Sequence, residues 1–162
     1  MNPIHLYCKA NKRKRNGEAV GAYAYILKGE DLYKEEIQVL KEETRVARLE
    51  LLALSEGLKD LDTQEKLGGK LYIYVSNEYL LEELLKGMED QLKGKPLNFN
   101  KGTGYVALWE AIENYLTKSK GYKVIGLNKK DRGEDEEAIK AHMGLLNKIV
   151  CDAINQHLPR KA

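Results

Sequence analysis

The sequence predicts an α/β domain built on a mixed five-stranded sheet. Three neighbouring strand patterns come first, and helical and strand patterns then alternate to the end of the chain. Consecutive strands joined by short turns pair antiparallel, whereas strands separated by helices pair parallel. The length of 162 residues suits one domain, so we expect a single domain over residues 1–162.

Composition favours a soluble intracellular protein. Hydrophobic residues make up 43% and charged residues 32%, and the formal charge is only +2, so total charge does not mark a nucleic-acid binder. Cys8 and Cys151 form neither a disulfide framework nor a zinc spacing. The chain has no signal-peptide pattern and no apolar run near the roughly 18 residues of a membrane span. We expect a cytoplasmic protein without membrane contact, and the pattern leaves its oligomeric state open.

The first third of the chain predicts an antiparallel meander. Ile4–Lys9 alternates between apolar and polar residues, Val20–Lys28 is rich in tyrosine, and Leu32–Leu40 alternates more weakly. Turn residues separate the three strands at Asn16–Gly17 and at residues 29–31.

The strongest helical pattern, Thr44–Leu61, places a carboxylate beside an apolar stripe. Thr44 is the expected N-cap. Glu50 lies next to the stripe, which consists of Leu51, Leu54, Leu58 and Leu61. A carboxylate removed from water needs a hydrogen-bond donor, a cation or a metal, so Glu50 is either a boundary residue that reaches solvent or a group with a partner.

The rest of the chain alternates between strands and helices. Ser76 or Asn77 is expected to cap the first of these helices, and a break near Gly144 is possible in the last. The expected elements are a strand over Leu71–Val75, a helix from Glu78 to about Leu92, a loop over residues 94–104, a helix over Tyr105–Leu116, a strand over Tyr122–Leu127, a charged exposed segment over residues 128–137 that overlaps the start of the last helix, and that helix from Glu134 or Asp135 to His157.

This order, together with five motifs, resembles the ribonuclease H family of type 1 over nearly the whole chain. The motifs are Tyr23–Leu27 in the second strand, Arg48–Ala53 in the first helix, Val75–Tyr79 after the fourth strand, Leu108–Ile112 in the helix before the last strand, and Cys151–Ile154 in the last helix. The resemblance implies a ribonuclease H-like mixed sheet, an antiparallel meander plus parallel strands, flanked by helices.

The resemblance also implies a site in which four carboxylates hold two Mg²⁺ ions. Glu50 and Asp152 match two of these carboxylates and would be the catalytic and metal-binding residues. Cys8 and Ser76 stand where the other two are expected. A thiol is a poor ligand for Mg²⁺ and a hydroxyl adds no charge, so we expect the two-metal site to be degenerate.

Two features keep an enzyme in consideration. His142 is the candidate for the mobile catalytic histidine that the resemblance implies, and a break in the last helix would be needed to bring it to Asp152. Acids of the charged segment could replace the missing ligands: Asp131, Glu134 and Asp135. Mg²⁺ or Mn²⁺ would be the cofactor of an active enzyme, and no other cofactor is expected.

Basic residues gather between the first two strands. They are Lys9, Lys12, Arg13, Lys14 and Arg15. They would contact phosphates, or they form a flexible basic turn that keeps an edge strand soluble. Arg48 is interpreted as a second phosphate contact or as the ion-pair partner of Glu50.

We therefore expect a ribonuclease H-like nucleic-acid-binding protein with a degenerate active site, whose partner is an RNA–DNA hybrid or another double-stranded nucleic acid. A metal-dependent endonuclease that cleaves the RNA strand of RNA–DNA hybrids is one alternative. A protein-binding scaffold is another.

Overall fold

The computed structural model describes residues 2–43, 45–99, 105–126 and 136–158. The five strands of these ranges are β1 (Ile4–Arg15), β2 (Glu18–Gly29), β3 (Leu32–Lys41), β4 (Leu71–Val75) and β5 (Tyr122–Gly126). The helices are α1 (Val46–Thr63), α2 (Glu78–Leu92), α3 (Val106–Lys118) and α4 (Glu136–His157).

The strands form one mixed sheet in the order β3-β2-β1-β4-β5. β1 pairs antiparallel with β2, and β2 pairs antiparallel with β3. β4 pairs parallel with both β1 and β5. This is the antiparallel meander plus parallel strands that the sequence predicts.

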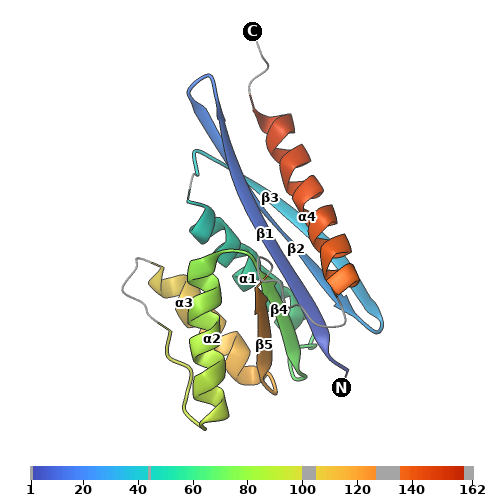
Figure 1. Ribbon diagram of the computed structural model, residues 1–162, viewed down its shortest axis with the longest axis vertical. Helices are drawn as coiled ribbons and strands as arrows, with labels where there is room; N and C mark the ends of the chain where they lie inside the picture. Colours follow the sequence, from blue (N-terminus) through green and yellow to red (C-terminus); the bar gives the residue numbers. More distant parts are fainter. Residues whose placement is uncertain (1, 44, 100–104, 127–135, 159–162) are drawn as a thin grey trace.

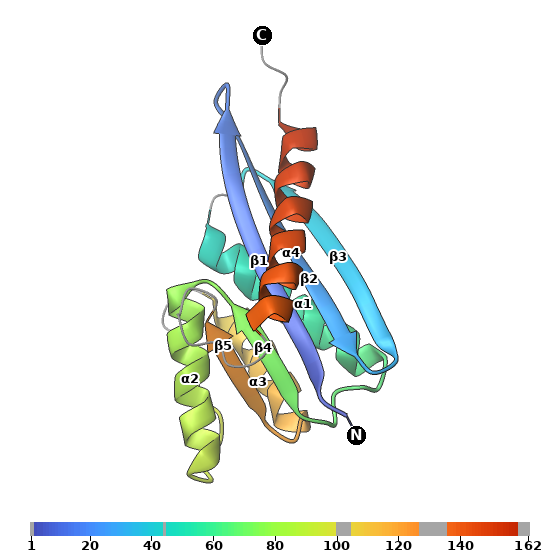
Figure 2. The same ribbon diagram turned by 45° about the vertical axis from the view of Figure 1, so that its right-hand side comes forward.

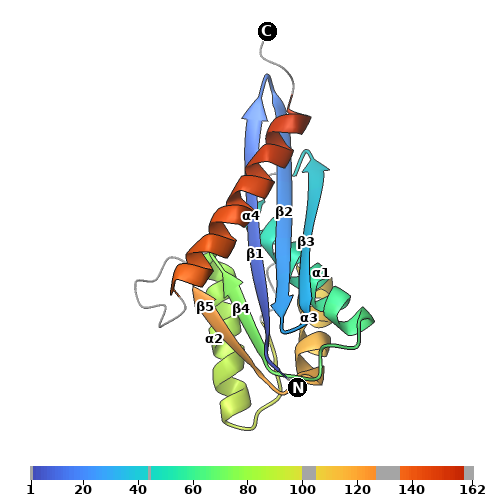
Figure 3. The same cartoon turned by 90° about the vertical axis from the view of Figure 1, so that its right-hand side faces the viewer.

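Helices cover both faces of the sheet. α1, α2 and α3 lie on one face, and α4 crosses β1 and β2 on the other (Figures 1 and 3). The alternation of β1 serves both layers, because Leu6 and Cys8 pack under α1 whereas Tyr7 packs under α4. Among the helices described, none combines the length and hydropathy needed to cross a bilayer.

β1 is longer than the sequence predicts. It continues past Lys9 through the basic residues to Arg15, so the interpretation of this segment as a flexible turn is wrong. Asn16 and Gly17 alone make the turn into β2, and both have positive φ (54° and 80°). A two-residue turn of this kind matches the twist of paired strands, which explains why pairing extends to Arg15 and Glu18.

The helix boundaries follow from local chemistry. The side-chain oxygen of Asn77 accepts hydrogen bonds from the backbone N–H groups of Tyr79 and Leu80, as expected of the N-cap of α2. α1 begins after Arg45, which has no side-chain cap; the expected cap, Thr44, lies outside the described residues. α4 is continuous through Gly144, so the possible break there is absent.

The core layer between the sheet and α1, α2 and α3, here called the first core layer, contains the one tryptophan of the sequence. Trp109 of α3 is fully buried, and its indole N–H donates to the Tyr79 hydroxyl at 2.9 Å. Its ring lies 4.7 Å, centroid to centroid, from Phe99. The hydrogen bond between Trp109 and Tyr79 joins α3 to α2 over the parallel half of the sheet.

Two helical glycines provide a matched test of how closely α1 packs on the sheet. A Cβ added to Gly57 of α1 would lie 2.6 Å from Leu6 Cδ1, whereas one added to Gly144 of α4 would meet nothing within 4 Å. Alanine improves helix propensity at both positions, but only Gly57→Ala overpacks a core. We expect the free energy of unfolding of Gly57→Ala to lie about 1 to 3 kcal/mol below that of Gly144→Ala in urea titrations. Equal stabilities would show that α1 and β1 are not in tight contact.

Candidate functional site

Glu50 is a buried carboxylate that accepts three hydrogen bonds. Its side chain, on the first turns of α1, is 1% exposed. Oε1 accepts from the backbone N–H of Ser76 at 3.0 Å and from its hydroxyl at 2.9 Å, and Oε2 accepts from the backbone N–H of Asn77 at 2.8 Å. Glu50 is therefore not a boundary residue that reaches solvent, because the junction between β4 and α2 satisfies it.

The junction supplies these donors because β4 has ended there. Val75 is the last residue of β4, and Asn77 is the N-cap of α2, so the N–H groups of Ser76 and Asn77 belong to neither element. Asn77 is used twice, since its side chain caps α2 while its backbone N–H binds Glu50. One carboxylate thus links α1 to the start of α2 across the end of β4.

Burial dominates the electrostatics of Glu50. Loss of solvent raises the pKa of its carboxyl, and the hydrogen bonds from Ser76 and Asn77, with the charge of Lys9, oppose that rise. The site favours the protonated acid more than water does. Glu50 therefore binds a proton more readily than an exposed glutamate does, because the effect of burial exceeds that of the donors.

Cys8 is a buried thiol beside this carboxylate. It is fully buried under α1, and burial followed by the charge of Glu50 raises its pKa well above the ordinary value. Nucleophilic attack and metal ligation both need the thiolate, which this setting disfavours. Cys8 therefore acts as a small apolar side chain of the core.

Within the described ranges, the residues around Glu50 do not assemble a two-metal centre. The resemblance implies four carboxylates, and of these the described part of the chain brings only Glu50 to the end of β4. The described residues hold no group of three or more His, Cys, Asp or Glu side chains arranged to bind a metal. The three donors on Glu50 also take up most of the lone pairs that a cation would use. Asp131, Glu134 and Asp135, the possible replacement ligands, lie outside the described residues.

Asp152 does not join Glu50. It is exposed on α4, next to Cys151, whose sulfur lies 3.9 Å from the side-chain nitrogens of Asn11 and Arg13. Asn11 is three residues beyond Cys8 on β1, about 10 Å along the strand, and α4 covers the face opposite α1. The motif that suggests Asp152 falls far along a continuous helix, and this length carries the carboxylate away from the end of β4.

His142 is held by aromatic packing and by its own helix. Its ring stacks on Tyr7 with centroids 4.7 Å apart, and Nδ1 lies 2.8 Å from the carbonyl oxygen of Ala138. Ten residues of unbroken helix separate it from Asp152, about 15 Å along the axis. His142 and Asp152 therefore do not share a site.

Arg48 pairs with a different acid from the one expected. Its guanidinium donates to Glu43 Oε2 at 3.1 Å, and Arg45 binds the same carboxylate at 3.0 Å. The hydrogen bond from Arg45 is the main cause that lowers the pKa of Glu43. The predicted ion pair between Arg48 and Glu50 is therefore wrong. Glu43, in the connection before α1, binds the Arg48 guanidinium instead. Glu50 accepts its hydrogen bonds from Ser76 and Asn77.

The basic residues of β1 divide between the two faces of the strand. Lys12 and Lys14 lie on the α1 side and are exposed, whereas Arg13 lies on the α4 side, where it donates to the Asn155 side chain at 2.9 Å. Lys9 is half-buried, and its charge opposes the rise in the pKa of Glu50. The basic segment is thus an ordered strand whose end is braced by α4.

Sequence reasoning did not find the donors that hold Glu50. Two of the three are backbone N–H groups, which leave no trace in residue identity. The available signal was the capping pattern at Ser76–Asn77, since the residues before a helix often carry unpaired donors.

Comparisons with known proteins identify the fold. No family model matches the sequence, and no curated protein matches it. Solved structures do match: LC11-RNase H1, isolated from compost by a metagenomic approach, is 16% identical, with a TM-score of 0.58 over 95% of this chain and 99% of the other. RNase H1 from the halophilic archaeon Halobacterium salinarum is 15% identical, with a TM-score of 0.55 over 93% and 98%.

A longer viral protein contains the same arrangement. The protease-reverse transcriptase of prototype foamy virus is 12% identical, with a TM-score of 0.64 over 98% of this chain and 21% of the viral chain. The chain therefore has a ribonuclease H-like fold, as the resemblance implies.

The raised pKa of Glu50 predicts a pH-dependent contribution to stability. A folded-state pKa above the ordinary glutamate value of about 4.3 means that the folded protein binds more protons, so this contribution is fully present below pH 4.3 and is lost as pH rises through the folded pKa. We expect the difference in unfolding free energy, wild type minus Glu50→Gln, to fall as pH rises above about 4.3.

Urea titrations at several pH values measure this difference. The exposed acid Glu82, changed to Gln, is the matched control and is expected to give a curve parallel to that of the wild type. A Glu50→Gln curve that is also parallel would refute the raised pKa.

Proposed function

We propose that this ribonuclease H-like domain binds double-helical nucleic acid, including RNA–DNA hybrid, and does not cleave it. The observation that carries the proposal is the ordered basic end of β1, which presents exposed cations on a braced strand. Phosphate contacts supply most of the affinity of proteins for nucleic acid when base edges are not read.

Charge at the tip of the β1–β2 hairpin supports phosphate binding. Lys12 and Lys14 are two residues apart on β1 and lie on the same side of the strand, with their Cα atoms about 7 Å apart. Neither lysine forms a salt bridge within the described ranges, so their charges are not neutralised there. The hairpin runs beside the C-terminal half of α4 and projects past α1 (Figures 1 and 2), so an extended ligand has access to it.

Order in the hairpin also supports this role. The bond from Arg13 to Asn155 ties the strand to α4. Strand pairing continues to the turn, with Arg15 opposite Glu18. Binding cations that are already positioned lose less conformational freedom than those of a disordered loop.

Two structures of similar fold support a double-helical ligand. LC11-RNase H1 was solved in complex with RNA/DNA hybrid, and the foamy viral protease-reverse transcriptase was solved in complex with dsDNA. Their identities to this chain are 16% and 11%. These ligands, transferred here as part of the proposal, agree with a basic strand that offers its cations to a phosphate backbone.

The environment of Glu50 supports the absence of cleavage. Hydrolysis by two metal ions needs carboxylates that share the cations, and here a neutral thiol and a hydroxyl stand beside one carboxylate. The hydroxyl of Ser76 donates to Glu50 at 2.9 Å, so the pair is stable without a metal. We also infer a reducing, cytoplasmic setting, in keeping with the free thiols of Cys8 and Cys151.

The binding proposal predicts a change in salt dependence. Replacing Lys12 and Lys14 with Gln removes two phosphate contacts, so the slope of log Kobs against log salt concentration should become shallower by about 2 for a labelled hybrid. Electrophoretic or anisotropy titrations at several salt concentrations measure the slope. The control replaces the exposed Lys59 and Lys86, on α1 and α2, with Gln and should keep the wild-type slope. An unchanged slope in the Lys12 and Lys14 variant would place the contacts elsewhere.

The second prediction concerns catalysis. Purified protein incubated with an end-labelled RNA–DNA hybrid and either Mg²⁺ or Mn²⁺ should leave the RNA strand intact on a denaturing gel. Glu50→Gln is the necessary companion, because trace cleavage by a contaminant persists in it. Cleavage by the wild type that disappears in Glu50→Gln would establish the endonuclease instead.

A further inference from the structure

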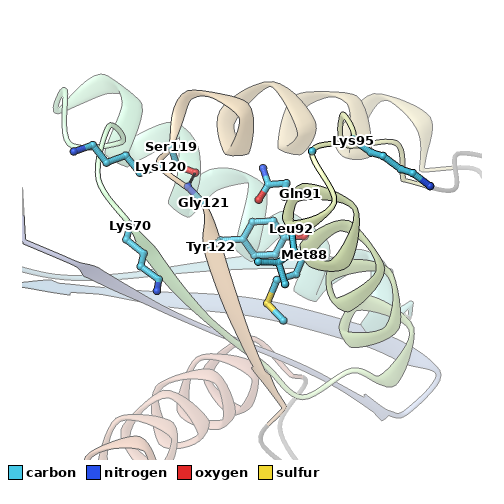
Figure 4. A pocket seen from close by; sticks show the side chains of 10 residues that line it. Lys70, Met88, Gln91, Leu92, Lys95, Ser119, Lys120, Gly121 and Tyr122 are labelled. Atoms are coloured by element: carbon cyan, nitrogen blue, oxygen red, sulfur yellow. Dashed lines mark hydrogen bonds between the residues drawn. The ribbon is translucent and has the colours of Figure 1, made fainter.

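A second surface feature lies away from both Glu50 and the basic hairpin. A pocket of about 550 Å³ opens between the C-terminal end of α2, the start of β4 and the connection from α3 to β5 (Figure 4). Met88, Leu92 and Tyr122 supply its apolar part, and Lys70, Lys95 and Lys120 stand around it. Lys70 precedes β4 and Ser76 follows it, so about 17 Å of strand separates this pocket from the Glu50 site.

The wall of the pocket is built tightly. Tyr122 is buried, and its hydroxyl donates to the carbonyl of Leu84 at 2.6 Å. A Cβ on Gly87 would lie 2.5 Å from the Tyr122 hydroxyl oxygen, so α2 packs closely on this side chain of β5. Backbone bonds fix the opposite wall, from Lys120 N–H to the Gly69 carbonyl and from Leu71 N–H to the Gly121 carbonyl, each 3.1 Å. The pocket is therefore an open depression with fixed walls.

The lysines carry charge that the described residues do not neutralise. Lys70, Lys95 and Lys120 are exposed, and none forms a salt bridge within the described part of the chain. Figure 4 shows Lys95 on one side of the pocket and Lys70 with Lys120 on the other. Asp90 is the acid whose charge reaches Tyr122, and it raises the pKa of that phenol after burial does. The residues that line the pocket include three lysines and no acid, so its rim is positive.

Two leucines of α2 at and beside the pocket are exposed to solvent instead of packing in the core. Leu92 is 82% exposed and Leu85 is 38% exposed. With Met88 they form a stripe at i, i+3 and i+7 on α2 that leads into the pocket. An exposed apolar stripe that ends in a cavity with a charged rim is typical of a surface that receives a partner.

We propose that this pocket, with its lysine rim, docks an acidic segment of a partner protein that inserts one bulky apolar side chain between Met88, Leu92 and Tyr122. Charge complementarity selects the segment, because carboxylates on either side of the anchor meet lysines on both sides of the pocket. The apolar anchor supplies the burial that the charges lack. Nucleic acid suits the surface less well, since a row of phosphates needs a row of cations such as β1 offers, not cations around an apolar cavity.

A synthetic peptide of Asp and Glu with one central Phe, labelled with a fluorophore, tests the proposal by anisotropy. Wild-type protein should bind it, and the triple variant Lys70→Glu, Lys95→Glu, Lys120→Glu should bind at least about tenfold more weakly. The same peptide with Ala in place of Phe should also lose about tenfold. Because the three lysines are exposed, the variant is expected to keep the wild-type unfolding midpoint, which shows that it folds.

The Lys12→Gln, Lys14→Gln variant is the matched control on the protein, and it should bind the peptide as the wild type does. Absence of peptide binding by the wild type would overturn the proposal, as would equal binding of the Phe and Ala peptides. A labelled hybrid that loses affinity in the triple variant, while the peptide does not, would make the pocket a nucleic-acid contact instead. The peptide results do not depend on whether β1 binds phosphates.

Discussion

The hydrogen bonds that hold the Glu50 carboxylate connect the layers of this fold. Glu50 and Ser55 are the buried polar or charged residues of the described core, and only Glu50 carries an ionisable group. Its three donors come from the two residues between β4 and α2. A buried carboxylate without them would cost several kcal/mol (order of magnitude), so the end of β4 and the start of α1 must keep their mutual position. The first core layer forms around this constraint.

The same constraint explains how a ribonuclease H-like fold persists with so few acids at the end of β4. Several carboxylates at one place repel one another unless cations lie between them. Serine at position 76 replaces that repulsion with a donated hydrogen bond, and cysteine at position 8 contributes volume without charge. The hydrogen bonds from Ser76 and Asn77 then hold Glu50 at the end of β4 without a bound ion.

Much of the architecture was predictable because periodicity reports burial. The leucine stripe of α1 and the apolar run of β4 each predict which side chains are buried, and both contribute to the first core layer. The length of β1 was not predictable in this way, since Lys12 to Arg15 are polar on both faces and carry no period. Their strand is specified by the turn at Asn16–Gly17 and by the pairing partner, which are properties of the hairpin as a whole.

The candidate site was only partly predictable. Glu50 was identified from its place beside the stripe, but its partners are backbone groups, and the arginine expected to pair with it binds Glu43. Asp152 was identified from a short motif in the last helix, and that helix is long and unbroken. Sequence motifs record neighbours along the chain, whereas a shared site depends on distances that the lengths of helices and strands decide.

The position of Trp109 determines what intrinsic fluorescence can report. The one tryptophan of the chain is buried between α2 and α3, with Tyr79 and Phe99 against its ring, and α4 packs on the other face of the sheet. Its emission follows the hydration of the first layer alone. Detachment of α4 would leave that signal unchanged, so circular dichroism, which registers all helices, is the probe that distinguishes partial from complete unfolding.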